Sequence, residues 1–166
     1  MLKRRAKGRL VEEDGQGKGT LAMEDGSEYR GELKDGVAQG EGKITFSDGR
    51  ELIGTFEKGK PHGDNLFLSF PDGRKYVGAY ENGKRHGWGK MYFPDGKEFV
   101  GEWFNDQPHG EGCMTYPDGT TEEGRWFRGR KVASDGEFSD KPQSLPLVAY
   151  LIPALLIIGV LIYYVV

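Results

Sequence analysis

Cysteine is almost absent from this chain of 166 residues, because Cys113 is the only one. A single thiol excludes an intramolecular disulfide framework and is typical of a reducing compartment. No C-x-x-C pair is present, which excludes a zinc ribbon. Nothing around Cys113 breaks the local sequence pattern as a catalytic nucleophile would. We therefore interpret it as an ordinary strand residue that faces away from the core.

The chain also lacks an excess of positive charge and a nucleotide-binding loop. It carries 23 Lys and Arg against 26 Asp and Glu, a net charge of −3, so a broadly basic nucleic-acid binder is not indicated. A G-x-x-x-x-G-K-[ST] loop for phosphates is absent. The basic N-terminal end, residues 1–7, is not followed by an apolar run and does not form a secretory signal. We interpret it as solvated, with contact to an anionic membrane surface as the alternative.

Long apolar runs are lacking until residue 147. Residues 147–166 carry no charged side chain and would form a helix about 30 Å long, which matches the hydrocarbon core of a bilayer. We predict one C-terminal transmembrane α-helix after a polar linker over residues 132–146; a buried helix is the alternative. Cations precede this helix and none follows it, so we expect a single-pass tail anchor with the rest of the chain facing the cytoplasm. The endoplasmic reticulum, the mitochondrial outer membrane and a bacterial inner membrane all fit.

Glycine is abundant, with 27 residues, and it recurs in a fixed order. An Asp-Gly pair begins at residues 25, 48, 72, 95 and 118, a spacing of 23 or 24 residues. In residues 74–96, RKYVGAYENGKRHGWGKMYFPDG, two runs of alternating apolar residues flank a Gly-rich bend at 81–87, which is typical of a β-hairpin. The closing Pro-Asp-Gly predicts a three-residue loop with a type I turn and a Gly bulge. We therefore expect these Asp residues to shape turns, rather than to act as catalytic or calcium-binding carboxylates.

The alternation places the large apolar side chains on one face of the predicted sheet and Lys, Glu and Thr on the other. No helical stretch occurs before Lys141, so a single twisted sheet must bury this stripe by curling on itself. The second repeat has one residue more than its neighbours, with Asn65 in place of a glycine, which predicts a β-bulge. We thus predict an all-β fold: an elongated single-layer antiparallel β-hairpin repeat array, or half-pipe, over residues 8–131.

Five features return in phase along the chain: aromatic-x-Gly-x-aromatic, a glycine bend, His-Gly-x-Gly, an apolar pair and Pro-Asp-Gly. In this order they resemble the MORN (membrane occupation and recognition nexus) repeat, over about residues 8–130. The resemblance implies about five repeats with partial ends, in an elongated single-layer β-structure that in some proteins binds partner peptides. The layout is also similar to that of the junctophilins, which bridge two membranes, although their long spacer is missing.

The aromatic inner wall of such a half-pipe would offer a groove to an apolar helix or an extended peptide of a protein partner. Most of the rings are expected to be core, and those at the open side are expected to stay partly exposed. The predicted partner-binding residues are Tyr29, Phe56, Tyr76, Tyr80, Phe99, Trp103 and Trp126.

Three histidines and four cations recur near the Gly-rich bends. His62, His86 and His109 lie two strands apart from one another, about 9–10 Å, which is too far to share a metal ion. We expect them to brace the bends, and we predict no catalytic residue, no metal and no cofactor. The cations would form an edge that contacts anionic phospholipid, and they are Lys58, Lys60, Lys84 and Arg85.

These features predict a non-enzymatic scaffold or adaptor, anchored in a membrane, that presents the groove to a protein partner at the cytosolic face. The alternative is a membrane tether that contacts anionic phospholipids through the basic repeat edges. MORN repeats precede catalytic domains in some lipid kinases and lysine methyltransferases, but no such domain follows here, so an enzyme would have to act in trans. Homo-oligomers are left open.

Overall fold

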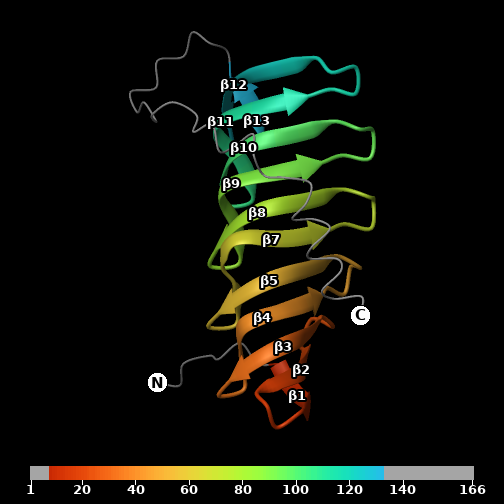
Figure 1. The fold of residues 1–166 in the computed structure, drawn as a ribbon, viewed down its shortest axis with the longest axis vertical. Coiled ribbons are helices and arrows are strands. Elements are labelled where there is room, and N and C mark those ends of the chain that lie inside the picture. Colours follow the sequence, from red (N-terminus) through yellow and green to blue (C-terminus); the bar gives the residue numbers. More distant parts are fainter. Residues whose placement is uncertain (1–7, 133–166) are drawn as a thin grey trace. The chain divides into compact units, whose positions relative to one another are not determined.

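The computed structural model describes residues 8–132, which form one antiparallel sheet of 13 strands (Figure 1). Strands that follow one another in the sequence are neighbours, except that the short β6 pairs with β5 alone and β5 then pairs with β7. No helix occurs within residues 8–132, so the predicted all-β antiparallel sheet is confirmed. The strands are β1 (Gly8–Glu13), β2 (Lys18–Met23), β3 (Glu28–Lys34), β4 (Val37–Thr45), β5 (Glu51–Glu57), β6 (Lys60–Pro61), β7 (Gly63–Ser69), β8 (Lys75–Glu81), β9 (Lys84–Tyr92), β10 (Glu98–Phe104), β11 (Gln107–Thr115), β12 (Thr121–Phe127) and β13 (Arg130–Val132).

Several predicted segments lie outside the described residues: the basic end at 1–7, the linker beyond residue 132 and the transmembrane helix at 147–166. In the part of the chain that is described, no helix is long and apolar enough to cross a membrane. The last strand ends at Val132, one residue beyond the predicted end of the repeat array.

Each Asp-Gly pair closes a three-residue hairpin loop, as predicted. Between β4 and β5, the Phe46 amide donates to the Arg50 carbonyl at 2.8 Å, and the Gly49 amide donates to the Phe46 carbonyl at 2.9 Å. Gly49 has φ of 85°, the left-handed conformation that a Gly bulge requires. Oδ1 of Asp48 accepts from the Arg50 amide at 3.1 Å, and the other four loops contain the same bond. These aspartates therefore shape the turns.

The opposite turns are tighter than the Gly-rich bend predicted at residues 81–87. Asn82 and Gly83, with φ of 52° and 88°, are the only residues between β8 and β9. Two such residues form a type I′ turn, whose twist matches that of the flanking strands. The bend prediction is wrong because Gly87, with φ of 78°, serves a bulge within β9, where Ala79 lies opposite residues 86–88.

The bulge predicted in the second repeat is confirmed, and it is larger than the bulges of the other repeats. Residues 54–55 of β5 lie opposite residues 62–66. The extra residue divides this strand into β6 and β7, and the His62 amide between them donates to the Thr55 carbonyl at 3.0 Å. The irregularity also shifts the register between β7 and β8, between Gly63 and Leu66, whereas the corresponding pairs in the other repeats have no shift.

Beyond the bulges, the type I′ turns form hydrogen bonds from one hairpin to the next. The amide of the second turn residue donates to a carbonyl two residues after the preceding type I′ turn. These bonds tie together the bent ends of successive hairpins, so the residues after each turn lie beside the core face. The donors and acceptors are Gly59 and Ala38 (2.9 Å), Gly83 and Pro61 (2.9 Å), Asp106 and Arg85 (3.1 Å), and Gly129 and Pro108 (2.9 Å).

The core lies on one face of the sheet, and its rings pack on glycines. Tyr29 and Tyr76 have an exposed fraction of 0%. A Cβ at Gly89 would lie 2.2–2.5 Å from the Tyr76 side chain, and one at Gly42 would lie 2.4–2.6 Å from Tyr29. The glycines therefore let each ring lie against the backbone of the neighbouring strand. The buried core consists of Leu21, Tyr29, Ala38, Ile44, Leu52, Phe56, Leu66, Leu68, Tyr76, Tyr80, Met91, Phe99 and Trp103.

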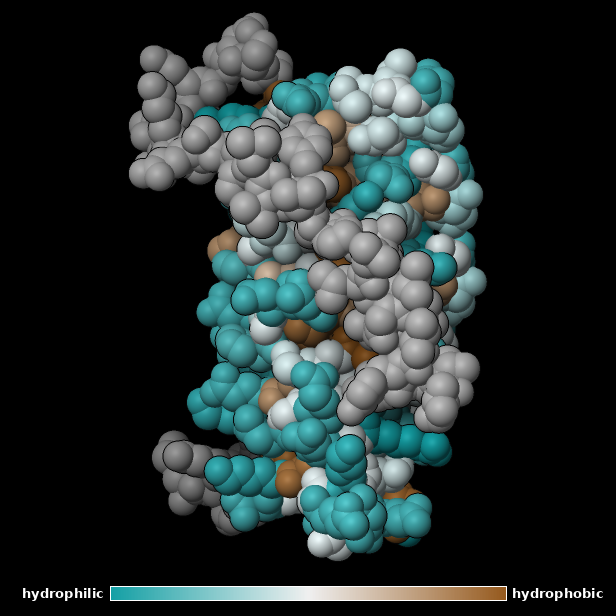
Figure 2. Space-filling view, viewed as in Figure 1, coloured by the Kyte–Doolittle hydropathy of each residue, from teal (hydrophilic) through white to brown (hydrophobic). Residues whose placement is uncertain are grey.

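The opposite face carries paired charges. Lys43 and Glu51 form an ion pair at 2.7 Å, and Lys90 and Glu98 form another at 2.7 Å. Exposed pairs of this kind contribute about 0–1 kcal/mol each. In the space-filling view, hydrophilic residues are prominent among the coloured atoms, with hydrophobic residues showing between them (Figure 2). Stability therefore has to come mainly from the ring-covered face.

Gly101→Ala is expected to destabilise the fold by about 1–3 kcal/mol, the usual effect of overpacking. A Cβ at Gly101 would lie 2.7 Å from the Phe99 ring and 2.7 Å from the Glu111 carbonyl oxygen. Gly124 holds the same repeat position, but the atoms nearest a Cβ there belong to the flexible Lys131 side chain. Gly124→Ala is therefore the matched control, and equal losses of both variants in chemical denaturation would contradict the explanation.

Acid is expected to weaken the hairpin loops. Hydrogen bonds from the backbone amides of Arg50 and Arg74 hold the pKa of Asp48 and Asp72 below the ordinary value of 3.8. A pKa lowered by folding means that the ionised carboxylate stabilises the fold above about pH 4, and that this stability is lost as the pH falls through the folded-state pKa. The thermal midpoint should therefore drop between pH 4 and pH 2. The drop should be smaller when Asp48→Ala and Asp72→Ala are combined, and an unchanged acid dependence would refute this role of the loops.

Candidate binding groove

A groove with a volume of about 450 Å³ lies on the core face, over the middle of the array. Its floor is formed by Leu52, Leu68 and Tyr80, from β5, β7 and β8. The Asp-Gly loops line one end, and the type I′ turns with the residues that follow them line the other. The lining residues are Phe46, Arg50, Leu52, Pro61, Leu68, Phe70, Tyr80, Gly83, Arg85 and Asp106.

Most of the predicted partner-binding rings are core residues, as expected. Neighbouring rings cover them edge to face, as Tyr29 and Phe56 do with their centroids 4.9 Å apart. Trp126 is partly exposed at the end of the stripe, and Tyr80 is the one member of the set that lines the groove. The remaining rings do not line the groove, although they are as buried as Tyr80 at no more than 5% exposed, and they are Tyr29, Phe56, Tyr76, Phe99 and Trp103.

Arg85 and Asp106 distinguish the groove from the rest of the array. The Asp106 carboxylate accepts from the Arg85 amide at 3.1 Å and from its Nε at 3.3 Å, and the Asp106 carbonyl accepts from its Nη2 at 2.8 Å. The guanidinium also lies 4.4 Å from the centroid of Trp103. Other hairpins have Ala38, Pro61 or Pro108 at the position of Arg85, and other type I′ turns have glycine at that of Asp106. Two departures from the repeat thus meet in space.

The four predicted lipid-contacting cations have different environments. The Lys58 side chain is 86% exposed and pairs with Glu57 at 2.8 Å, and Lys60 and Lys84 are exposed as well. The Arg85 side chain is only 16% exposed and lines the groove. The sequence grouped Arg85 with the others because it follows the same turn. Its partner Asp106 comes from the next hairpin, so the sequence pattern alone did not reveal the pair.

Two phenylalanines with stacked guanidiniums line the loop side of the groove. Arg50 lies 4.6 Å from the centroid of Phe46 and pairs with Asp48 at 2.7 Å. Arg74 stacks on Phe70 in the same way in the next loop, also at 4.6 Å. Stacking of this kind holds the guanidinium plane against the ring while leaving its edge free for hydrogen bonds. These residues were not among the predicted partner-binding residues, although the order Phe-x-Asp-Gly-Arg in two successive loops points to them.

Tyr80 places a hydroxyl in the groove. Burial raises the pKa of Tyr80 well above its ordinary value, so the phenol stays protonated at neutral pH and can donate a hydrogen bond. The hydroxyls of Tyr29 and Tyr76 donate to backbone carbonyls at 2.8 and 3.1 Å. Among the described residues, the Tyr80 hydroxyl has no hydrogen-bond partner, which leaves it for a ligand or for water.

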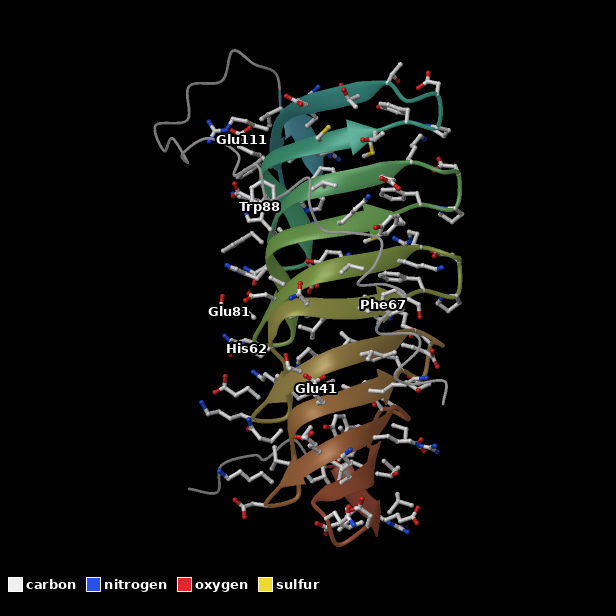
Figure 3. The ribbon with its side chains drawn as sticks, in the orientation of Figure 1. Glu41, His62, Phe67, Glu81, Trp88 and Glu111 are labelled. Carbon is white, nitrogen blue, oxygen red and sulfur yellow. The ribbon has the colours of Figure 1, made fainter. Side chains whose placement is uncertain are left out.

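The histidines lie along the ends of the strands, outside the groove. The His62 Nε2 is 3.7 Å from Glu57, and the His86 Nε2 is 3.5 Å from Glu81, across the turns that they were expected to brace. His62 and Glu81 lie toward the same side of the ribbon as Trp88 and Glu111 (Figure 3). Within residues 8–132, no group of three His, Cys, Asp or Glu side chains is placed to hold a metal ion.

Two exposed rings were not foreseen. Phe104 and Phe127 are 50% and 40% exposed, and both contact His109, with centroids 5.6 and 5.3 Å away. The sequence gives one sign of them, because they occupy a repeat position at which earlier repeats have lysine or glutamate.

Cys113 lies on β11, where burial raises the pKa of its thiol. A thiol that stays protonated is a poor nucleophile.

Comparison with known proteins identifies the repeat. A family model of the MORN repeat matches residues 29–49, 53–63, 76–98 and 99–121, so four MORN repeats are detected. No curated protein sequence matches the chain. Among solved structures, the chain is similar to the SAS-4 (dCPAP) TCP domain of Drosophila melanogaster, in complex with a proline-rich motif of Ana2 (dSTIL). The identity is 9%, 69% of this chain and 75% of that chain are covered, and the TM-score is 0.34.

Replacing Arg85 and Asp106 by the residues that other repeats have at these positions should preserve the fold. Arg85→Pro with Asp106→Gly reproduces the residues that surround Pro61 and Pro108. Arg85→Pro alone should be less stable than the double variant by about 1 kcal/mol, because Asp106 would keep its φ of 70° without the Arg85 side chain. Chemical denaturation measures the difference, and a double variant less stable than the single one would contradict it.

Proposed function

We propose that this chain is a non-enzymatic binding module, in which the groove on the core face of the MORN repeats holds a segment of a protein partner. The detected repeats support a repeat-based binding role. The observation that carries the proposal is the groove lining, which combines an apolar floor with two phenylalanine rings, two guanidiniums and a phenol. A mainly apolar concavity with a few convergent polar groups is the usual composition of a binding site.

The dimensions of the groove favour an extended segment. Its volume of about 450 Å³ lies in the range of about 300–1,000 Å³ found for ligand sites, which is enough for a few side chains and too little for a folded domain. Its lining comes from several successive hairpins, so one segment would contact several repeats. Binding of such a segment would attach the partner to this chain and would involve no catalytic step.

We further propose that the array works at the cytosolic face of a membrane, attached through residues 147–166. This stretch has no charged residue over a length that fits a bilayer. Residues 133–146 can reach roughly 45 Å when fully extended, which would keep the groove close to partners on the same membrane. A scaffold that recruits proteins to that surface combines both features.

Replacing the two groove phenylalanines should remove the partner. A proximity-labelling enzyme fused before residue 1 should mark a set of neighbours in cells, and Phe46→Ser with Phe70→Ser should reduce recovery of the groove-bound neighbour about tenfold or more. Burial of an aromatic ring contributes enough for such a loss. Phe93→Ser is the matched control, because Phe93 holds the same loop position and packs against the same core without lining the groove.

The same cells can be used to test whether the chain is anchored in a membrane. Recovery of the labelled chain in an alkali-resistant membrane pellet is the expected result, and recovery in the supernatant would overturn the anchor. An identical set of neighbours for wild type and the Phe46 and Phe70 variant would overturn the groove as the binding site. Circular dichroism of the purified variants verifies that they are folded.

A further inference from the structure

Three residues that line the groove, Arg50, Tyr80 and Arg85, have hydrogen-bond donors that the described residues leave unused. The Arg50 guanidinium uses its Nε for Asp48, and that of Arg85 uses Nε and Nη2 for Asp106. A guanidinium has five N–H donors, so both retain donors beyond these bonds. The Tyr80 hydroxyl is a further donor without a partner in the described part of the chain. The site therefore offers hydrogen-bond donors in excess of acceptors.

Each arginine of the lining is paired with a carboxylate, Arg50 with Asp48 at 2.7 Å and Arg85 with Asp106 at 3.3 Å, so the charges of the site are balanced while N–H donors remain unused. Arg50 and Arg85 both line the groove, and Asp106 is the single carboxylate among its lining residues. Both arginines and Asp106 line the same groove as Tyr80. The Phe46 and Phe70 rings stand at the loop side of these groups. A ligand that complements this arrangement carries a group rich in hydrogen-bond acceptors, such as a carboxylate, next to an apolar group.

We infer that the groove recognises an extended peptide through a glutamate or aspartate side chain held by Arg50, Arg85 and Tyr80, with the neighbouring apolar side chain against Phe46 and Phe70. This inference rests on the proposed function, and it names the chemistry of the partner. A carboxylate can accept from two guanidiniums and a phenol at once, because its two oxygens offer about four acceptor positions. The unused N–H and O–H donors then select acidic segments, which supply acceptors, over basic ones, which supply only more donors.

A phosphorylated side chain fits this site less well than a carboxylate. Phosphate carries a charge of about −1.5 to −2 at neutral pH, whereas both arginines of the lining are already paired with a carboxylate, Asp48 or Asp106. The Asp106 carboxylate would repel the additional charge. A phosphoserine version of the peptide is therefore a test of charge matching, and it should bind more weakly than the glutamate version.

The test uses the full-length chain in detergent and a phage-displayed library of random dodecapeptides. Selected peptides should share an acidic residue beside an apolar one. For the tightest peptide, Glu→Gln should weaken binding about tenfold or more, which corresponds to loss of a hydrogen-bonded charge. In the protein, Arg50→Gln should cause a similar loss, and Tyr80→Phe a smaller one. Arg74→Gln is the matched control, because Arg74 stacks on Phe70 and pairs with Asp72 as Arg50 does with Phe46 and Asp48, without lining the groove.

The outcomes separate this inference from the proposed function. If wild type binds the Glu→Gln peptide as tightly as the glutamate peptide, but binding is lost in the Phe46→Ser and Phe70→Ser variant, the groove binds peptides and the acidic anchor is wrong. If the phosphoserine peptide binds more tightly than the glutamate peptide, the carboxylate assignment is wrong. If no peptide depends on the two phenylalanines, the proposed function fails together with this inference. Loss of the Glu→Gln effect in Arg50→Gln alone, and not in Arg74→Gln, supports it.

Discussion

The packing of aromatic rings on glycine backbone is the contact on which the rest of this sheet depends. A single sheet has no second layer, so its apolar side chains can leave water only by covering one another and the strands beside them. Tyr76 does so by lying against Gly89, where even a Cβ would be 2.2 Å from its hydroxyl. Each buried ring removes about 150–250 Å² from water, and the same contact recurs between Tyr29 and Gly42 and between Phe99 and Gly112. The glycine content of the chain is thus a requirement of the core as well as of the turns.

The bulges convert this layer into a surface with a groove. At Gly87 the strand takes on extra residues and bends, which is the usual effect of a bulge. The type I′ turns then bond to the preceding hairpin, for example from the Gly83 amide to the Pro61 carbonyl at 2.9 Å. These bonds place the residues after each turn opposite the Asp-Gly loops. The groove is therefore a consequence of backbone geometry, and side-chain identity decides only what it can hold.

Departures from the repeat indicate where that identity matters. Asp106 adopts φ of 70° where the other type I′ turns have glycine, a conformation that is less favourable for a residue with a side chain by about 1 kcal/mol or more. Its bonds to Arg85 offset this. A glycine and a proline would form the same backbone without charge, so the pair adds a chemical property that the fold does not need. Its position at the groove, beside Tyr80, is the basis of the binding role proposed for this array.

The sequence by itself determined the features that depend on nearby residues. The alternation of apolar and polar residues predicted the strands, and the Asp-Gly loops such as residues 46–50 predicted the type I turn with its bulge. The extra residue near Asn65 predicted the irregular second repeat. Only the tertiary structure decided which rings have free surface, because Tyr29 and Phe56 become buried through contacts between hairpins. It also decided that Arg85 belongs to a groove and not to a basic edge, since its partner lies 21 residues away. Local sequence patterns specify the turns and the faces of the strands. The register between hairpins specifies which residues that differ from the repeat, such as Arg85 and Asp106, come into contact.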